Sequence, residues 1–81
     1  TVGPNPFGNT TMVNFELAEA SLTSIRLTDA AGKSMLVFEG QLQQGKQAIA
    51  VDGVKLKLAA GVYILEVRAG EQRAARSVQF Q

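Results

Sequence analysis

LAAGVYILEV, residues 58–67, is the stretch of sequence that decides the fold. A Leu-x-x-Gly-x-Tyr step leads into alternating apolar residues, which is typical of a tyrosine corner in a β-sandwich. Gly61 can adopt backbone angles that other residues avoid, and Tyr63 can bury its ring while its hydroxyl bonds back to the backbone of the corner. The alternative is an ordinary turn followed by a strand with a half-buried tyrosine. Both interpretations are structural, so this segment predicts a fold and no chemistry.

Alternating side chains between regularly spaced glycines extend the all-β pattern along the chain. The glycines at positions 32, 40, 45, 53, 61 and 70 are spaced like tight turns between short strands. One face of each predicted strand is apolar, and the residues on these faces are Val13, Phe15, Leu17, Ile25, Leu27, Ile49, Val51, Tyr63, Leu65, Val67, Val78 and Phe80. The pattern predicts an all-β domain, an immunoglobulin-like antiparallel β-sandwich of about seven strands.

Three segments are locally ambiguous. Residues 35–38 are all apolar, so periodicity does not decide whether Met35 and Val37 or Leu36 and Phe38 face inward. We favour the second pair. Leu17–Leu22 and Glu71–Arg76 are rich in helix formers, but isolated helices shorter than about 12 residues are marginal. We therefore expect a loop and a hairpin arm in these two places.

Size, composition and charge exclude several classes of function. With 81 residues, no Cys and no His, the chain is one small domain without disulfides, thiolate metal sites or the commonest general base. A net charge of +1 is too small for a nucleic-acid binder, and no two acidic residues have the spacing of paired catalytic carboxylates. We therefore expect no enzyme activity, no cofactor or metal, and neither a nucleic acid nor a small-molecule substrate as partner. Residues 55–81 nevertheless carry a net charge of +3, from five basic and two acidic residues. Such a charge is usually that of a solvated sheet face, and the alternative is a surface for an acidic partner or an anionic surface.

The segment Asp29-Ala30-Ala31-Gly32-Lys33 is predicted to be a turn between two strands. An Asp side chain there can accept hydrogen bonds from the backbone amides of its own turn. The segment does not form a phosphate loop, because a single glycine lacks the successive amides and the following helix that hold phosphate. The most plausible linker is the start of the chain, where neither proline can donate a backbone hydrogen bond. We assign residues 1–7 to a linker segment and residues 8–81 to the folded domain.

Several of these motifs together resemble the type IX secretion C-terminal sorting domain, type A, of the Por secretion system family. They are Pro4-Asn5-Pro6-Phe7 followed by TTMVNFEL at 10–17, then Asp29-Ala30-Ala31-Gly32-Lys33, then Leu58-Ala59-Ala60-Gly61-Val62-Tyr63, and finally Arg76-Ser77-Val78. Each motif is weak alone, but their order and their span of almost the whole chain are fairly specific. The family tends to have Lys-x-Val near its end and a basic last residue. Here Arg76 keeps the charge of that Lys, whereas the last residue is Gln81.

The resemblance implies a C-terminal signal that directs an attached cargo protein through the type IX outer-membrane translocon. Translocon and shuttle proteins would be the partners, and a sortase-like signal peptidase would cut the domain off just upstream. The protein would pass through the periplasm to the cell surface or the outside. By position, Pro4–Phe7 would form the start of the domain, with Phe7 as its anchor. The export machinery would read the last strand, which comprises Arg76, Ser77, Val78, Gln79, Phe80 and Gln81.

Two alternatives stay open at this point. Val78 and Phe80 have a second interpretation, as side chains that complete the core. The domain also has a second candidate function, as an immunoglobulin-like accessory or glycan-binding module of a surface enzyme. That function would need exposed aromatic side chains, whereas the four Phe and one Tyr fall mostly at predicted core positions and Trp is absent.

Overall fold

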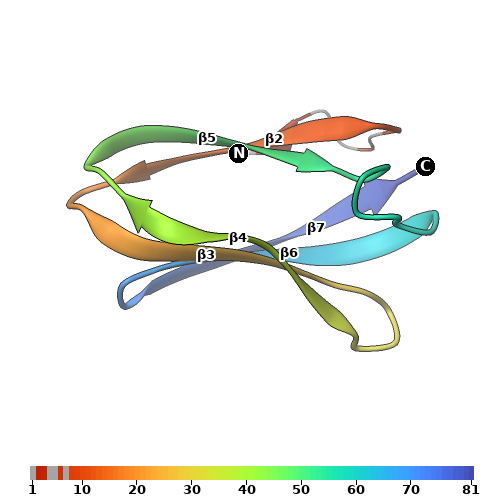
Figure 1. Ribbon diagram of the computed structural model, residues 1–81. Helices are drawn as coiled ribbons and strands as arrows, with labels where there is room; N and C mark the ends of the chain where they lie inside the picture. The colour runs from red at the N-terminus through yellow and green to blue at the C-terminus, as the bar shows by residue number, and fades with distance from the viewer. Residues whose placement is uncertain (1, 4–5, 7) are drawn as a thin grey trace.

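The computed structural model describes residues 2, 3, 6 and 8–81 of the chain. Its strands form two sheets that stack as the layers of a sandwich (Figure 1). The three-stranded sheet has the order β1-β2-β5 and comprises β1 (Val2–Gly3), β2 (Thr10–Leu17) and β5 (Gly45–Asp52). The four-stranded sheet has the order β4-β3-β6-β7 and comprises β3 (Ser21–Thr28), β4 (Ser34–Leu42), β6 (Gly61–Ala69) and β7 (Gln72–Phe80). All neighbouring strands are antiparallel.

This architecture confirms the predicted antiparallel β-sandwich. The described chain has six long strands and the two-residue β1, where about seven strands were predicted. β1, β2 and β5 take the places of strands A, B and E of an immunoglobulin-like domain, and β3, β6 and β7 take those of C, F and G, with β4 beside β3. The helix-prone stretches form a connection after β2 and an arm of β7, as expected. The predictions for Pro4, Asn5 and Phe7 lie outside the described residues.

The core lies between the sheets and consists of inward residues of the predicted alternation together with Leu58. Its buried cluster comprises Val13, Ile25, Leu27, Val51, Leu58, Tyr63, Leu65, Val78 and Phe80. Leu17 is buried as well, whereas Phe15 and Val67 face inward but are only half-buried. Burial of one such side chain contributes roughly 1.5–3 kcal/mol, so this cluster supplies most of the favourable free energy of folding.

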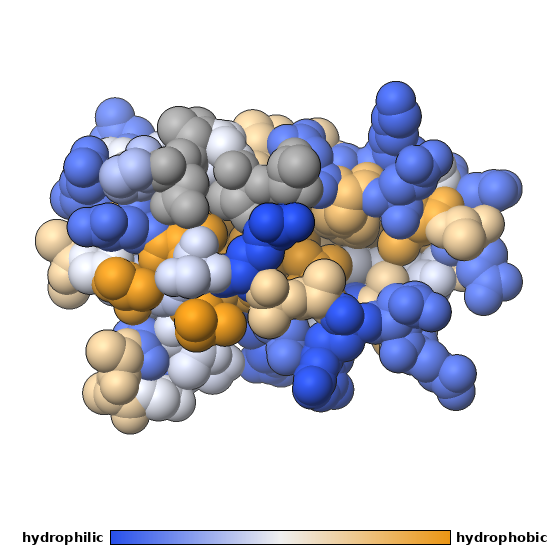
Figure 2. Space-filling model, turned by 180° about the vertical axis from the view of Figure 1, so that it is seen from behind, coloured by the Kyte–Doolittle hydropathy of each residue, from blue (hydrophilic) through white to orange (hydrophobic). Residues whose placement is uncertain are grey.

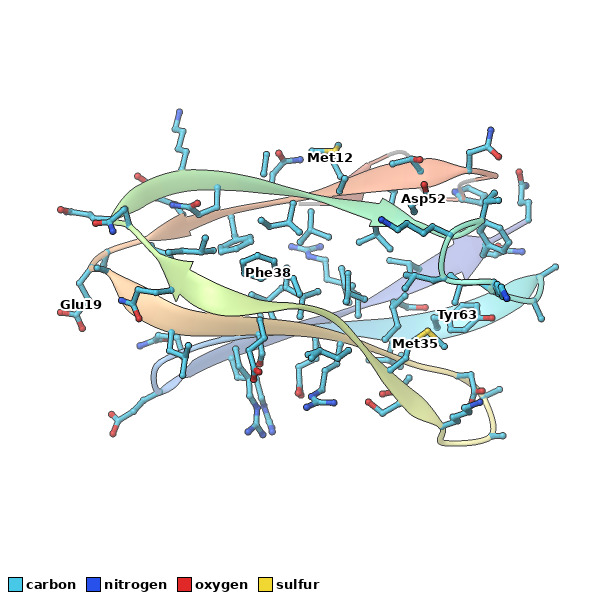
Figure 3. The ribbon with its side chains drawn as sticks, viewed as in Figure 1. Met12, Glu19, Met35, Phe38, Asp52 and Tyr63 are labelled. Carbon is cyan, nitrogen blue, oxygen red and sulfur yellow. The ribbon has the colours of Figure 1, made fainter. Side chains whose placement is uncertain are left out.

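β4 departs from the predicted facing of its apolar run. Met35 and Phe38 both lie opposite inward residues of β3, whereas Leu36 lies opposite Arg26 on the outer face. The register shift makes Val37 the extra residue of a β-bulge, and a bulge reverses the alternation that follows it. Phe38 lies between the sheets as predicted (Figure 3). The expectation that Leu36 faces inward is wrong, since 44% of its surface is exposed.

The tyrosine corner predicted from residues 58–67 is present before β6. The Tyr63 hydroxyl donates a hydrogen bond to the backbone carbonyl of Ala59 over 2.6 Å. The Tyr63 side chain lies between the layers with Leu58 in the same buried cluster (Figure 3). The bond ties the beginning of β6 to the connection that crosses from the other sheet, which is the role of this motif in sandwich folds.

The predicted turn at Asp29 also forms. The Asp29 carboxylate accepts hydrogen bonds from the backbone N–H groups of Ala31 and Lys33, at 3.0 and 2.8 Å. Gly32 has a φ of 88°, a left-handed conformation that glycine adopts without a steric penalty. Asp52 repeats this arrangement at the end of β5, where it accepts from the N–H groups two and three residues further on. Both turns are therefore structural.

Candidate functional site

The last strand, β7, forms one edge of the four-stranded sheet. It pairs with β6 along its whole length and with no other strand of the described chain. Val78 and Phe80 point into the core, with 2% and 8% of their surface exposed. The Phe80 ring lies so close to the Gly53 backbone that a methyl group on Gly53 would overlap it. The end of β7 therefore completes the core.

The remaining residues of the predicted recognition segment are at the surface. Arg76, Ser77, Gln79 and Gln81 are all exposed. Arg76 pairs with Leu65, an inward residue of β6, yet it is exposed, because it lines an open groove between the two sheets. The structure thus divides the predicted segment into two buried side chains and four exposed ones. The role of the segment in recognition stays a prediction.

A small basic cluster occupies the outer face of the four-stranded sheet. Arg68 and Arg73 each place Nε near one oxygen of the Glu66 carboxylate, at 3.4 and 3.7 Å. Arg26 lies opposite Glu66 in the pairing of β3 with β6. These are surface ion pairs, which contribute between about 0 and 1 kcal/mol each. This part of the outer face therefore brings three Arg residues and one Glu together on neighbouring strands.

A lateral groove of about 680 Å³ opens between the two sheets. Residues 13–19 of β2 and its following turn form one wall, and residues of β6 and β7 form the other. Within the described residues, β1 pairs with β2 only at Met12 and Val13, so the rest of this edge of β2 has no strand beside it. The uncovered inner surface explains why Phe15 and Val67 are half-buried. In Figure 2, which shows the molecule from this side, hydrophobic surface is visible between the polar side chains of the two layers.

The structural motifs quoted from the sequence do not converge on a chemical site. The Asp29 turn joins β3 to β4 and the tyrosine corner precedes β6, so both lie at the end of the sandwich where the chain also ends (Figure 1). The described residues contain no group of three or more side chains suited to hold a metal ion. Over the same residues, no helical segment has the length and hydropathy of a membrane span.

The aromatic side chains also give no support to a glycan-binding surface. Tyr63 and Phe80 are buried, and Phe15 and Phe38 are half-buried, so no aromatic residue in the described part of the chain is exposed. A glycan platform needs at least one exposed aromatic face. The second candidate function therefore lacks the feature that it requires within this part of the molecule.

Sequence reasoning missed the groove and the contact between Phe80 and Gly53. The prolines at the start of the chain predict a linker, whereas Val2 and Gly3 pair with β2 in the three-stranded sheet. No residue pattern within β2 predicts the groove beside it. In the sequence, nothing distinguishes Gly53 from the other glycines predicted to lie in turns. Only the packing of Phe80 against it shows why this position has no side chain.

The chain was compared with known protein families, curated proteins and solved structures. A family model described as the secretion system C-terminal sorting domain matches residues 1–80. Neither the curated proteins nor the solved structures contained a match. The matched range covers both sheets, the tyrosine corner and the last strand through Phe80. This chain therefore belongs to the family of secretion system C-terminal sorting domains.

Proposed function

We propose that this domain carries an attached cargo protein through the outer-membrane translocon of the type IX pathway, and that a sortase-like signal peptidase then removes it. The observation that carries the proposal is the family match over residues 1–80. The family is a sorting signal attached to a preceding cargo, not a catalytic domain. In the proposal, shuttle proteins receive the domain after the translocon, and the cargo passes from the periplasm to the cell surface or the outside.

In this proposal, the secretion machinery recognises the end of β7, residues 76–81. Val78 and Phe80 anchor this strand in the core, so its backbone is held in one position. Arg76, Ser77 and Gln79 then present exposed side chains from an ordered strand. A partner can read alternate side chains of such a strand, and the ordered strand has little conformational entropy left to lose on binding.

The charge of the partner follows from the same surface. Residues 55–81 carry a net charge of +3, and Arg76 makes no ion pair with the described residues. An acidic receptor would complement this charge and would accelerate association. Residues 1–7 would act as the junction to the cargo, which β1 ties to the folded signal of residues 8–81. The peptidase would cut upstream of β1.

A charge reversal in the full-length parent protein tests the recognition strand. The variant is Arg76→Glu, and the matched control is Lys55→Glu, which makes the same charge change in the exposed connection between β5 and β6. In cells with the type IX pathway, Arg76→Glu is expected to leave the protein in the periplasm, whereas Lys55→Glu reaches the cell surface. Both variants should keep the wild-type thermal transition, because exposed substitutions usually change stability by less than about 0.5 kcal/mol.

Two outcomes would contradict the proposal, one for the recognition strand and one for the sorting signal as a whole. Export of Arg76→Glu at the level of Lys55→Glu would remove recognition from β7. A folded reporter fused ahead of residues 1–81, supplied with an inner-membrane signal peptide, tests the signal itself. If that reporter folds but stays in the periplasm, the chain is not sufficient as a sorting signal.

A further inference from the structure

The groove lies beside β1, the first strand of the described chain. β1 pairs with β2 at two positions, Val2 opposite Val13 and Gly3 opposite Met12. β2 continues to Leu17, and β5 pairs with it along its full length on the other side. Over Phe15–Leu17 the groove side of β2 has no strand partner in the described chain. An unpaired strand edge presents backbone donors and acceptors in the register of a further strand.

The register of β1 defines what would lie along this edge. In an antiparallel pair, each step upstream in one strand matches a step downstream in the other. Continued upstream from Val2, the pairing places the three residues that precede Thr1 opposite Phe15, Glu16 and Leu17. A strand that follows an existing register needs no change in the sheet. The site therefore continues an interface that the domain already has.

The facing of β2 determines which of these residues would enter the groove. Phe15 and Leu17 face inward, whereas Glu16 is exposed on the outer face. Residues opposite one another in a sheet share a face, so the first and third residues before Thr1 would point into the groove. There they would meet Leu65 and Val67 of β6. The second residue would lie beside Glu16 and face solvent.

We propose that the three residues preceding Thr1 in the parent protein extend β1 along β2 and fill this groove. The inference rests on the proposed function in one respect, namely that a cargo precedes the domain. It means that the cargo is joined through a strand of the sheet and not through a free linker. Phe15, Leu65 and Val67 form the apolar part of the groove wall, which Arg76 also lines, so we expect apolar side chains at the first and third positions. A peptidase that cuts within this strand could act only after the strand is released.

Amide hydrogen exchange in the full-length parent protein tests this pairing. In one variant, three prolines replace the residues before Thr1, because proline cannot donate a hydrogen bond to a neighbouring strand. In a second variant, Ala74→Trp fills the groove from β7. Its matched control is Ala75→Trp, because Ala74 lines the groove whereas Ala75 does not and pairs with the outward Glu66. The measurement is the exchange rate of the Phe15–Leu17 amides that point away from β5.

The proposal expects these amides to exchange about tenfold or more faster in the proline variant and in Ala74→Trp, and at the wild-type rate in Ala75→Trp. Unchanged exchange in both test variants would overturn it. If protection of these amides depends on protein concentration, a second copy of the chain occupies the groove. If protection needs added secretion proteins, the secretion machinery occupies it. Either result also overturns the proposal. The measurement requires no export, so its failure would leave the sorting function untouched.

Discussion

Removing the hydroxyl group of Tyr63 by Tyr63→Phe should lower the stability of the domain by about 1 kcal/mol. The substitution keeps the aromatic ring, which is buried in the core with 5% of the residue exposed. It deletes only the hydrogen bond to the carbonyl of Ala59. The effect therefore measures the corner bond and not the packing of the ring.

The geometry of this bond sets the expected magnitude. Its length of 2.6 Å is at the short end for a hydroxyl donor and a carbonyl acceptor, so the bond is fully formed. Ala59 is exposed, and water can hydrate its carbonyl once the hydroxyl is gone. The loss should therefore be close to the net value of a hydrogen bond, about 0.5–1.5 kcal/mol, without the larger penalty of a buried unpaired group.

Thermal and urea denaturation of the isolated domain measure this loss. A change of about 1 kcal/mol lowers the melting temperature of a domain of this size by roughly 4–8 °C. Ser34→Ala is the matched control, because it removes an exposed hydroxyl that donates no hydrogen bond in the described chain. Equal midpoints for Tyr63→Phe and Ser34→Ala would show that the corner bond does not stabilise the fold.

Five further substitutions, at four positions, test the packing and the turns by the same denaturation assay. Gly53→Ala should cost about 1–3 kcal/mol, since its methyl group would displace the Phe80 ring; a neutral result would mean that Phe80 has room to move. Asp29→Ala should cost about 1 kcal/mol through the loss of two hydrogen bonds to its turn, and Asp29→Asn should restore part of it. Leu36→Ser should change stability by less than about 0.5 kcal/mol because Leu36 is on the outer face, whereas Phe38→Ala should cost about 3 kcal/mol. Equal losses of stability in Leu36→Ser and Phe38→Ala would contradict the β-bulge in β4.

The features predicted correctly depend on residues close together in the sequence. The hydroxyl of Tyr63 reaches a carbonyl four residues away, and Asp29 caps amides two and four residues away. Such contacts form in any chain with that local order, so a short motif is enough to identify them. The alternation of apolar residues is equally local, and it correctly assigned most of the inward side chains.

The errors and omissions arose where two distant segments meet. The facing of Leu36 depends on a bulge in the pairing of β4 with β3, which periodicity within one strand does not contain. The exposure of Phe15 depends on how far β1 extends along β2. The contact of Phe80 with Gly53 joins the last strand to the end of β5. Each is a question of register or length between strands, and it is settled by non-local pairing.

The candidate site shows the same division. The sequence by itself determined a sandwich with a tyrosine corner, the absence of Cys and His, a basic C-terminal third, and a motif order that resembles a sorting domain. Only the tertiary structure decided that Val78 and Phe80 belong to the core, that Arg76 remains exposed, and that a groove lies beside β2. The physical reason is that alternation assigns a side chain to one face of its strand, whereas burial depends on whether the opposite sheet extends over that face.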